Sequence, residues 1–140
     1  MKKASFEFVD DSPALMAASI AAEALQLSLT GDVAGALTLL RAARENGPLD
    51  ESALSLLFNL LHDSGPTDEA LAACGEGLAL AKRPITTSTW HLRRGLLHLE
   101  AGHRNDAVKD LTMVLKLKAS EDHRAQAQKA LLRAAELPKS

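Results

Sequence analysis

Three glycines with the same surroundings recur along this chain. Gly31, Gly65 and Gly102 are each followed five residues later by an alanine, and the intervals between the glycines are 34 and 37 residues. Internal repeats with periods of roughly 20 to 50 residues are typical of solenoid proteins, in which one supersecondary unit is copied and stacked. The spacing therefore predicts one structural unit repeated three times.

The residues around each glycine follow helical spacing. Beyond it, three small or aliphatic positions recur at i, i+4 and i+7, which places them on one helix face. They are Ala36, Leu40 and Ala43, then Ala70, Cys74 and Gly77, then Ala107, Leu111 and Val114. Seven and four residues before the glycines stand Ala24 and Leu27, Phe58 and Leu61, and Gly95 and His98. A glycine suits the left-handed position just beyond a helix. Each copy is therefore predicted to be a helix hairpin that turns at its glycine.

The composition favours helices throughout. The apolar residues are mainly Ala and Leu, with three Phe, one Trp and no Tyr, and such a chain forms helices more readily than strands. We expect an all-α fold of about seven helices, near residues 14–29, 33–46, 50–63, 67–81, 86–101, 104–117 and 121–136. Asp50 and Thr67 are predicted N-caps, and Lys82 to Thr87 are expected to form a longer loop.

The third copy reads TWHLRRGLLHLEAGHRNDAVKDLTMVLKL from Thr89 to Leu117, and it resembles the tetratricopeptide repeat. In that family a bulky residue, a small residue, a second bulky residue, the turn glycine, an alanine and a final proline recur every 34 residues. Pro48 takes the final position in the first copy, whereas His98 replaces the aromatic residue of the third copy and Phe58 the small residue of the second. The resemblance implies a right-handed α-solenoid of antiparallel helix hairpins, with repeats at about 17–48, 51–84 and 88–119 in one domain of residues 14–137.

The two ends of such an array require caps. A repeat array leaves an apolar face open at each end unless a cap covers it. The helix at 121–136 is the predicted cap, with Ala125, Leu132 and Ala135 facing inward. Residues 1–13 are expected to form an N-terminal arm that lies over the first helices or is disordered.

The resemblance also implies a concave groove lined by the first helix of each repeat, which would bind a peptide segment or a partner helix. Carried onto this sequence, the groove residues are Ala18, Ala21, Leu25, Ser28, Ser55, Asn59, His62, Thr89, Leu92, Arg93 and Leu96. Co-chaperone members of the family grip a terminal carboxylate with a clamp that begins with a Lys and Asn pair. Ala21 and Leu25 occupy that pair here, so we do not expect recognition of chaperone tails.

Charge is distributed unevenly. Residues 1–81 carry four Lys or Arg and twelve Asp or Glu, a net charge of −8, whereas residues 82–140 carry twelve and six, a net charge of +6. Three interpretations stay open: steering of an acidic partner protein or peptide toward the third repeat, head-to-tail association as a weak homo-oligomer, or a monomer with a solvated surface and no partner there. Nucleic acid is not an expected partner, because the net charge is −2 and few aromatic residues are present to stack on bases.

No motif indicates catalysis. The chain has no GxxxxGK[ST], GxGxxG, HExxH or GxSxG pattern, so we expect neither enzyme activity nor a cofactor. His91, His98 and His103 do not have the spacing of a metal motif, and no neighbouring carboxylate or thiol is expected to complete a site, so no metal is expected. Cys74 is predicted to be a buried small apolar residue, and Trp90 either a packing residue or an anchor for a partner.

The remaining features concern location and role. Cys74 is the only cysteine, which fits a reducing compartment, and no run of about 18 apolar residues is present to cross a membrane. The Ala- and Leu-rich composition suits a bacterial cytoplasmic protein. We therefore expect a protein–protein interaction module that acts as an adaptor or scaffold. The alternatives are a small secretion-type or assembly chaperone and, in another class, a small-ligand sensor or enzyme-accessory subunit.

Overall fold

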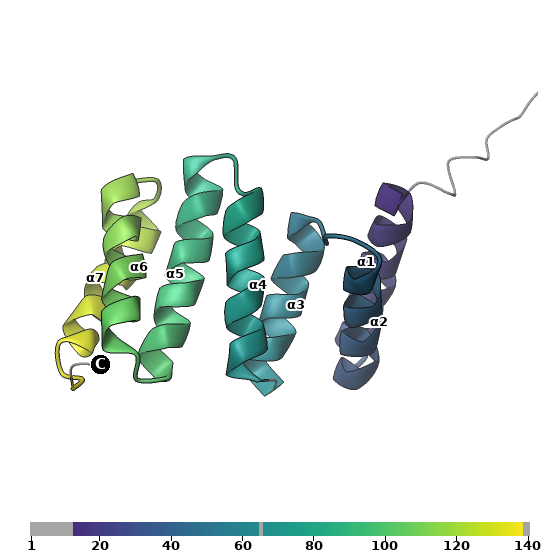
Figure 1. The fold of residues 1–140 in the computed structure, drawn as a ribbon, viewed down its shortest axis with the longest axis horizontal. Helices are drawn as coiled ribbons and strands as arrows, with labels where there is room; N and C mark the ends of the chain where they lie inside the picture. The colour runs from purple at the N-terminus through teal and green to yellow at the C-terminus, as the bar shows by residue number, and fades with distance from the viewer. Residues whose placement is uncertain (1–12, 65, 139–140) are drawn as a thin grey trace, which may run out of the picture. The chain divides into compact units, whose positions relative to one another are not determined.

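The computed structural model describes residues 13–64 and 66–138, and all regular secondary structure in these ranges is α-helical (Figure 1). The helices are α1 (Pro13–Leu29), α2 (Val33–Glu45), α3 (Glu51–Ser64), α4 (Thr67–Leu80), α5 (Pro84–Glu100), α6 (Arg104–Leu117) and α7 (Glu121–Ala134). The all-α prediction with about seven helices is confirmed for the described residues. Of the predicted arm of residues 1–13, only Pro13 is described, and it begins α1. The rest of that arm and the predicted turn at Gly65 lie outside the described residues.

The chain divides into two compact units, residues 1–60 and 61–140. In the first unit, α1 packs against α2. In the second, α5 packs against α4, α6 and α7, and α6 also packs against α7 (Figure 1). Four pairs of consecutive helices thus pack as neighbours, namely α1 with α2, α4 with α5, α5 with α6, and α6 with α7, which is consistent with a helical-repeat arrangement. Within residues 13–64 and 66–138, no helix combines the length and apolar character needed to cross a membrane.

The repeated positions form the core face of the second helix in each copy. All nine residues predicted on that face are buried: Ala36, Leu40, Ala43, Ala70, Cys74, Gly77, Ala107, Leu111 and Val114. Gly31 and Gly102 have φ angles of 94° and 81°, in the left-handed region that glycine adopts without strain. The i, i+4, i+7 pattern and the turn glycines therefore have the predicted roles wherever the structure describes them.

Two predictions about helix ends are wrong. Thr67 is the first residue of α4 and not its N-cap, because Pro66 holds the cap position without a side-chain hydrogen bond. Lys82 to Thr87 do not form a loop, since α5 already begins at Pro84, whose fixed φ and missing N–H suit a first helical turn. The extra residues lengthen α5 to 17 residues. The prediction for Asp50 is confirmed, because its Oδ1 accepts a hydrogen bond of 2.9 Å from the backbone N–H of Ala53.

Helix α7 covers the apolar side of α5 and α6, but not with the predicted face. Ala125, Leu132 and Ala135 are exposed, Leu132 to 73%. The buried residues are instead Ala127, Ala130 and Ala134, which pack in one cluster with Leu92, Leu99, Ala107, Leu111 and Val114.

A buried polar contact accompanies this orientation of α7. The fully buried Ser88 Oγ lies 2.9 Å from His123 Nδ1, and His123 shares a helical stripe with Ala127, Ala130 and Ala134. Because Ser88 belongs to α5, this contact lies on the same side of α7 as the alanine stripe that packs against α5 and α6. Small alanine side chains on that stripe allow the helices to approach closely.

Candidate binding pocket on α5 and α6

The predicted groove residues fall into both compact units. Leu25 and Asn59 are exposed and Ser28 and Ser55 are half-buried in residues 1–60. Ala18 is exposed there and Ala21 half-buried. The other five predicted residues, His62, Thr89, Leu92, Arg93 and Leu96, belong to residues 61–140.

Leu92 is not available to a partner. It is 6% exposed and belongs to the core cluster of α5, α6 and α7, and Leu96 is partly buried against the same cluster. Thr89 is half-buried and its Oγ1 donates a hydrogen bond of 3.0 Å to the backbone carbonyl of Ile85. The groove assignment of Leu92 is wrong, because the apolar side of α5 is covered by α6 and α7.

The two charged groove residues of this unit also contact their neighbours. The guanidinium carbon of Arg93 lies 4.5 Å from the centre of the Trp90 ring, a cation–π geometry. His62 Nε2 lies 3.2 Å from Glu100 Oε1, so the end of α3 is tied to the end of α5. The contact of Arg93 lies within α5, whereas that of His62 connects two helices.

The pocket in this unit lies on a different side of α5. Its volume is about 630 Å³, and it is lined by three residues of α5, namely His91, Arg94 and His98. From α6 come Asp106, Lys109, Asp110, Met113 and Lys116, with Val108 and Thr112. His91, Arg94 and His98 are spaced at i, i+3 and i+7, so one stripe of α5 forms one wall and α6 forms the other.

A buried carboxylate joins the two walls. Asp110 is 4% exposed and accepts hydrogen bonds from Arg94 Nε to Oδ2 at 2.8 Å and from Arg94 Nη2 to Oδ1 at 2.9 Å. His91 Nδ1 donates to Oδ1 at 2.8 Å. Paired, charge-assisted bonds of this kind fix both position and orientation. The network therefore sets the distance and rotation of α6 against α5 and leaves Asp110 with its charge compensated.

The pKa values of these groups follow from the same contacts. Burial disfavours the charged form of Asp110, but the hydrogen bonds from Arg94 and His91 outweigh it and hold the carboxyl pKa below its usual value. The bond to Asp110 raises the pKa of Arg94. Burial raises the pKa of the Cys74 thiol to about 12. Cys74 is fully buried, as predicted, and its thiol is protonated and unreactive at neutral pH.

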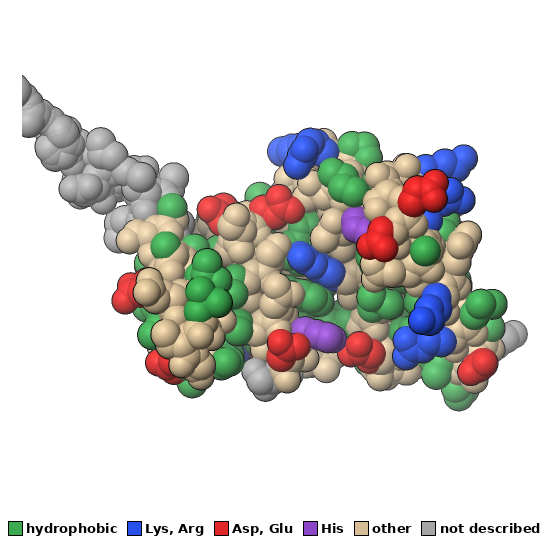
Figure 2. Space-filling view, turned by 180° about the vertical axis from the view of Figure 1, so that it is seen from behind, with side chains coloured by type: hydrophobic (Ala, Val, Ile, Leu, Met, Phe, Trp, Pro, Cys, Tyr) green, Lys and Arg blue, Asp and Glu red, His purple; other side chains and the backbone are tan. Residues whose placement is uncertain are grey.

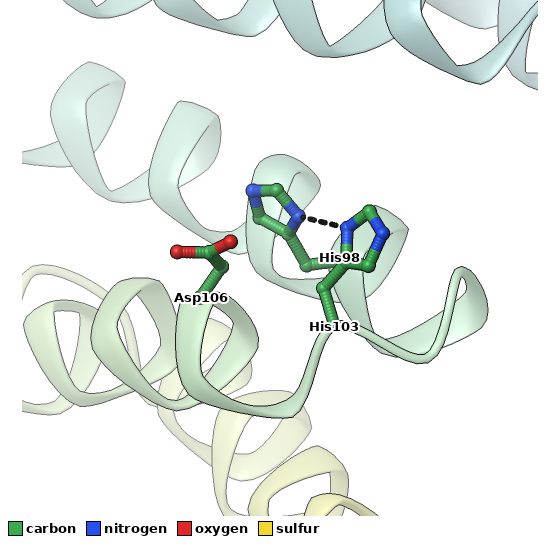
Figure 3. Close-up of side chains that lie close together, drawn as sticks. All are labelled: His98, His103 and Asp106. Carbon is green, nitrogen blue, oxygen red and sulfur yellow. Dashed lines mark hydrogen bonds between the residues drawn. The ribbon is translucent and has the colours of Figure 1, made fainter. Parts of the chain in front are cut away.

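Two histidines and an aspartate lie close together at the turn between α5 and α6 (Figure 3), and His98 and Asp106 of this group also line the pocket. His98 Nδ1 and His103 Nδ1 are 3.1 Å apart, and the ring centres are 5.3 Å apart. One potential ligand atom from each of His98, His103 and Asp106 lies within 4.8 Å of the others. Burial lowers the pKa of His98, which favours its neutral form. The expectation that no carboxylate stands near these histidines is wrong, because the turn at Gly102 returns Asp106 to them.

The basic character predicted for the C-terminal part is visible on the surface. In the face seen in Figure 2, Lys and Arg side chains gather over the C-terminal part of the described chain, while Asp and Glu side chains occur on both parts. In the pocket, Lys109 and Lys116 are exposed. With Asp110 compensated by Arg94 and His91, the exposed charges on the α6 wall are those of Lys109, Lys116 and Asp106, a net charge of +1.

Comparison with known proteins finds no protein-family model that matches this chain, and no curated protein is similar to it. The resemblance to the tetratricopeptide repeat thus depends on the spacing of residues and on the helices described above.

Proposed function

We propose that this chain is a tetratricopeptide-type repeat protein that binds an acidic segment of a partner protein in the α5–α6 pocket. The observation that carries the proposal is the pocket itself, which offers about 630 Å³ and two exposed lysines next to a buried carboxylate that is already paired. Binding pockets commonly span about 300 to 1,000 Å³. The buried repeat positions and the left-handed Gly31 and Gly102 support the family assignment.

The spacing of the lysines suggests the form of the segment. Lys109 and Lys116 are seven residues apart on α6, so they share a face and their backbones are separated by about 10.5 Å. A peptide in the polyproline II conformation has three residues per turn and rises about 3.1 Å per residue, so carboxylates three residues apart point to the same side and lie about 9.3 Å apart, close to that separation. Met113 and Val108 add apolar surface to the same wall. The preferred segment is therefore two acidic residues three positions apart with an apolar residue between them.

The affinity should depend on charge. Exposed ion pairs are worth up to about 1 kcal/mol each and are screened by salt. Reversing the charge of both lysines replaces two attractions by two repulsions. We expect K109E/K116E to weaken binding at least tenfold, equivalent to about 1.4 kcal/mol or more, and wild-type binding to weaken as salt is raised.

The test is fluorescence anisotropy with labelled synthetic peptides in a buffer that contains EDTA. One peptide has two Glu residues three positions apart flanking a Leu, and a second has the same composition with adjacent Glu residues. The matched control is K129E/R133E, which makes the same charge change at two exposed positions of α7 outside the pocket. Circular dichroism confirms that both variants fold.

The proposal requires binding of the spaced peptide that K109E/K116E loses and K129E/R133E keeps. Equal losses in both variants would show a general charge effect and would overturn it, as would equal binding of the two peptides. A third peptide, residues 4–11 of this chain, carries Glu7 and Asp10 three positions apart with Phe8 and Val9 between them. Tighter binding of that peptide, with concentration-dependent self-association of the protein, would assign the pocket to a second copy and contradict a separate partner.

A further inference from the structure

The turn between α5 and α6 brings together three side chains that commonly bind metals. His98 lies in the last turn of α5, His103 is the N-cap residue of α6, and Asp106 lies in the first turn of α6. Between them Gly102 adopts a φ of 81°, which reverses the chain. In Figure 3 the two imidazoles face each other and the carboxylate of Asp106 lies beside the ring of His98.

The separation of the two histidines fits a shared ion. Two imidazole nitrogens that each lie about 2.0–2.1 Å from a tetrahedral zinc ion are about 3.3 Å apart. His98 Nδ1 and His103 Nδ1 are 3.1 Å apart. Without an ion, one of these nitrogens must carry a hydrogen that points at the other. An ion could take the place of that hydrogen if both rings carry their proton on Nε2, with little movement of either ring.

The third ligand also lies within reach. One carboxylate oxygen of Asp106 lies within 4.8 Å of a ring nitrogen of each histidine, and the side chain is exposed, so Asp106 is the candidate third ligand. His103 is exposed as well, which allows the ion to enter from solvent. A set of two imidazoles and one carboxylate suits divalent zinc, cobalt and nickel better than magnesium or calcium, which prefer oxygen ligands.

We propose that His98, His103 and Asp106 form a binding site for a divalent transition-metal ion, with Zn²⁺ as the best-matched ion, and that solvent completes the coordination. This site does not depend on the proposed peptide binding. Because α5, α6 and the Gly102 turn hold the three residues before an ion binds, little chain ordering accompanies binding. The ion should therefore stabilise the folded chain, since it binds the native state in preference to the unfolded one.

The experiment uses the full chain without an affinity tag. Cobalt chloride is added while visible absorption is recorded, because a cobalt ion in a site with few ligands absorbs in that region. Zinc chloride is then added to displace the cobalt, and thermal unfolding is measured with zinc and with EDTA. The expected results are one cobalt per chain, displacement by zinc, and a higher melting temperature with zinc.

Variants assign the ligands. H103A removes a ring that makes no capping hydrogen bond, and D106N keeps the shape of the third ligand while removing its charge. H62A is the matched control, since it deletes an exposed histidine outside the cluster. Both H103A and D106N should lower the affinity for cobalt at least tenfold, and H62A should leave it unchanged.

Three results would overturn the proposal. Wild-type protein that shows no visible cobalt bands and no zinc-dependent rise in melting temperature has no such site. Unchanged affinity in H103A would place the ion elsewhere, and unchanged affinity in D106N would exclude the carboxylate. Since the peptide assay is run in EDTA, failure of the metal site leaves the proposed function untouched, and failure of peptide binding leaves the metal site untouched.

Discussion

Helix α5 makes two contacts of opposite character, one with α4 and one with α6. Toward α4, the indole of Trp90 is fully buried against Gly77, and any Cβ at that glycine would collide with the ring. Toward α6, Arg94 and His91 donate hydrogen bonds to the buried carboxylate of Asp110. One contact fits a large apolar side chain over a position without a side chain, and the other pairs charges.

The difference shows how one helix can be packed tightly on one side and line a pocket on the other. Apolar burial is non-directional and depends on the area removed from water. The stability of the contact between α4 and α5 should therefore depend little on pH and strongly on the volumes of its side chains. The contact between α5 and α6 depends on hydrogen-bond geometry and on ionised groups, so its stability should change with pH. It also places polar side chains beside the pocket. Substitutions can separate these two dependences.

The largest expected effect lies on the α4 side. W90A should lower the free energy of unfolding by about 3–5 kcal/mol, because it empties the space of a fully buried aromatic side chain. G77L alone should cost about 1–3 kcal/mol through overpacking against the ring. Because leucine can enter the space that the indole leaves, the double variant W90A/G77L should lose less than the sum of the single losses. Urea unfolding of the four proteins measures this, and additive losses would contradict the packing of Gly77 on Trp90.

The second-largest effect is expected when the hydrogen bonds between α5 and α6 are weakened. D110N should lower the free energy of unfolding at neutral pH by about 1–3 kcal/mol, because Arg94 and His91 lose a charged acceptor in a buried position. The control is E23Q, which neutralises an exposed carboxylate on α1. It should change the free energy of unfolding by less than about 0.5 kcal/mol.

The same carboxylate gives a pH signature that the α4 side lacks. The pKa of Asp110 is lower in the folded chain than its usual value of 3.8, so its contribution is complete above that value. The contribution is lost as the pH falls from 3.8 through the folded pKa, because the protonated group no longer accepts the charge-assisted bonds. Wild-type protein should therefore approach D110N in stability as acid is added, while W90A keeps its deficit. A constant difference between wild type and D110N down to the folded pKa would contradict the ion pair.

The smallest effect lies outside both contacts, at the end of α6. Lys118 has a φ of 51°, a left-handed conformation that strains a residue with a Cβ. K118G should therefore raise the free energy of unfolding by about 0.5–1 kcal/mol. K116G, two residues earlier within the helix, should lower it by about 1 kcal/mol. A loss of stability in K118G would contradict the left-handed end of α6.

Local features of the fold could be predicted well. The i, i+4, i+7 spacing identified buried positions in α2, α4 and α6, and Asp50 was recognisable as a cap because its side chain bonds a backbone N–H only three residues away. The inward face of α7 was not predictable in the same way. Leu131 and Leu132 are adjacent and alanines occur on several faces, so two stripes are nearly equivalent in the sequence. The buried stripe is the one that includes His123, whose contact with Ser88 joins residues 35 positions apart.

The candidate site was less predictable, because its residues come together across helices. His91, Arg94 and Asp110 carry no sequence motif, and Asp110 is 16 residues from Arg94. The weak signal for the proposed metal site was a pair of histidines and an aspartate on either side of a turn glycine, at His98, His103 and Asp106. Spacing along one helix could not reveal it, since the ligands lie on two.

The amino-acid sequence alone was enough to predict the all-helical fold, the turns at Gly31 and Gly102, and the buried face of the second helix in each copy. These features depend on interactions between residues a few positions apart. Tertiary structure decided which side of α5 is open, which stripe of α7 is buried, and which charges meet. Those features depend on the rotation of one helix against another, and that rotation is set by side chains distant in sequence, such as Trp90 on Gly77 and Arg94 on Asp110.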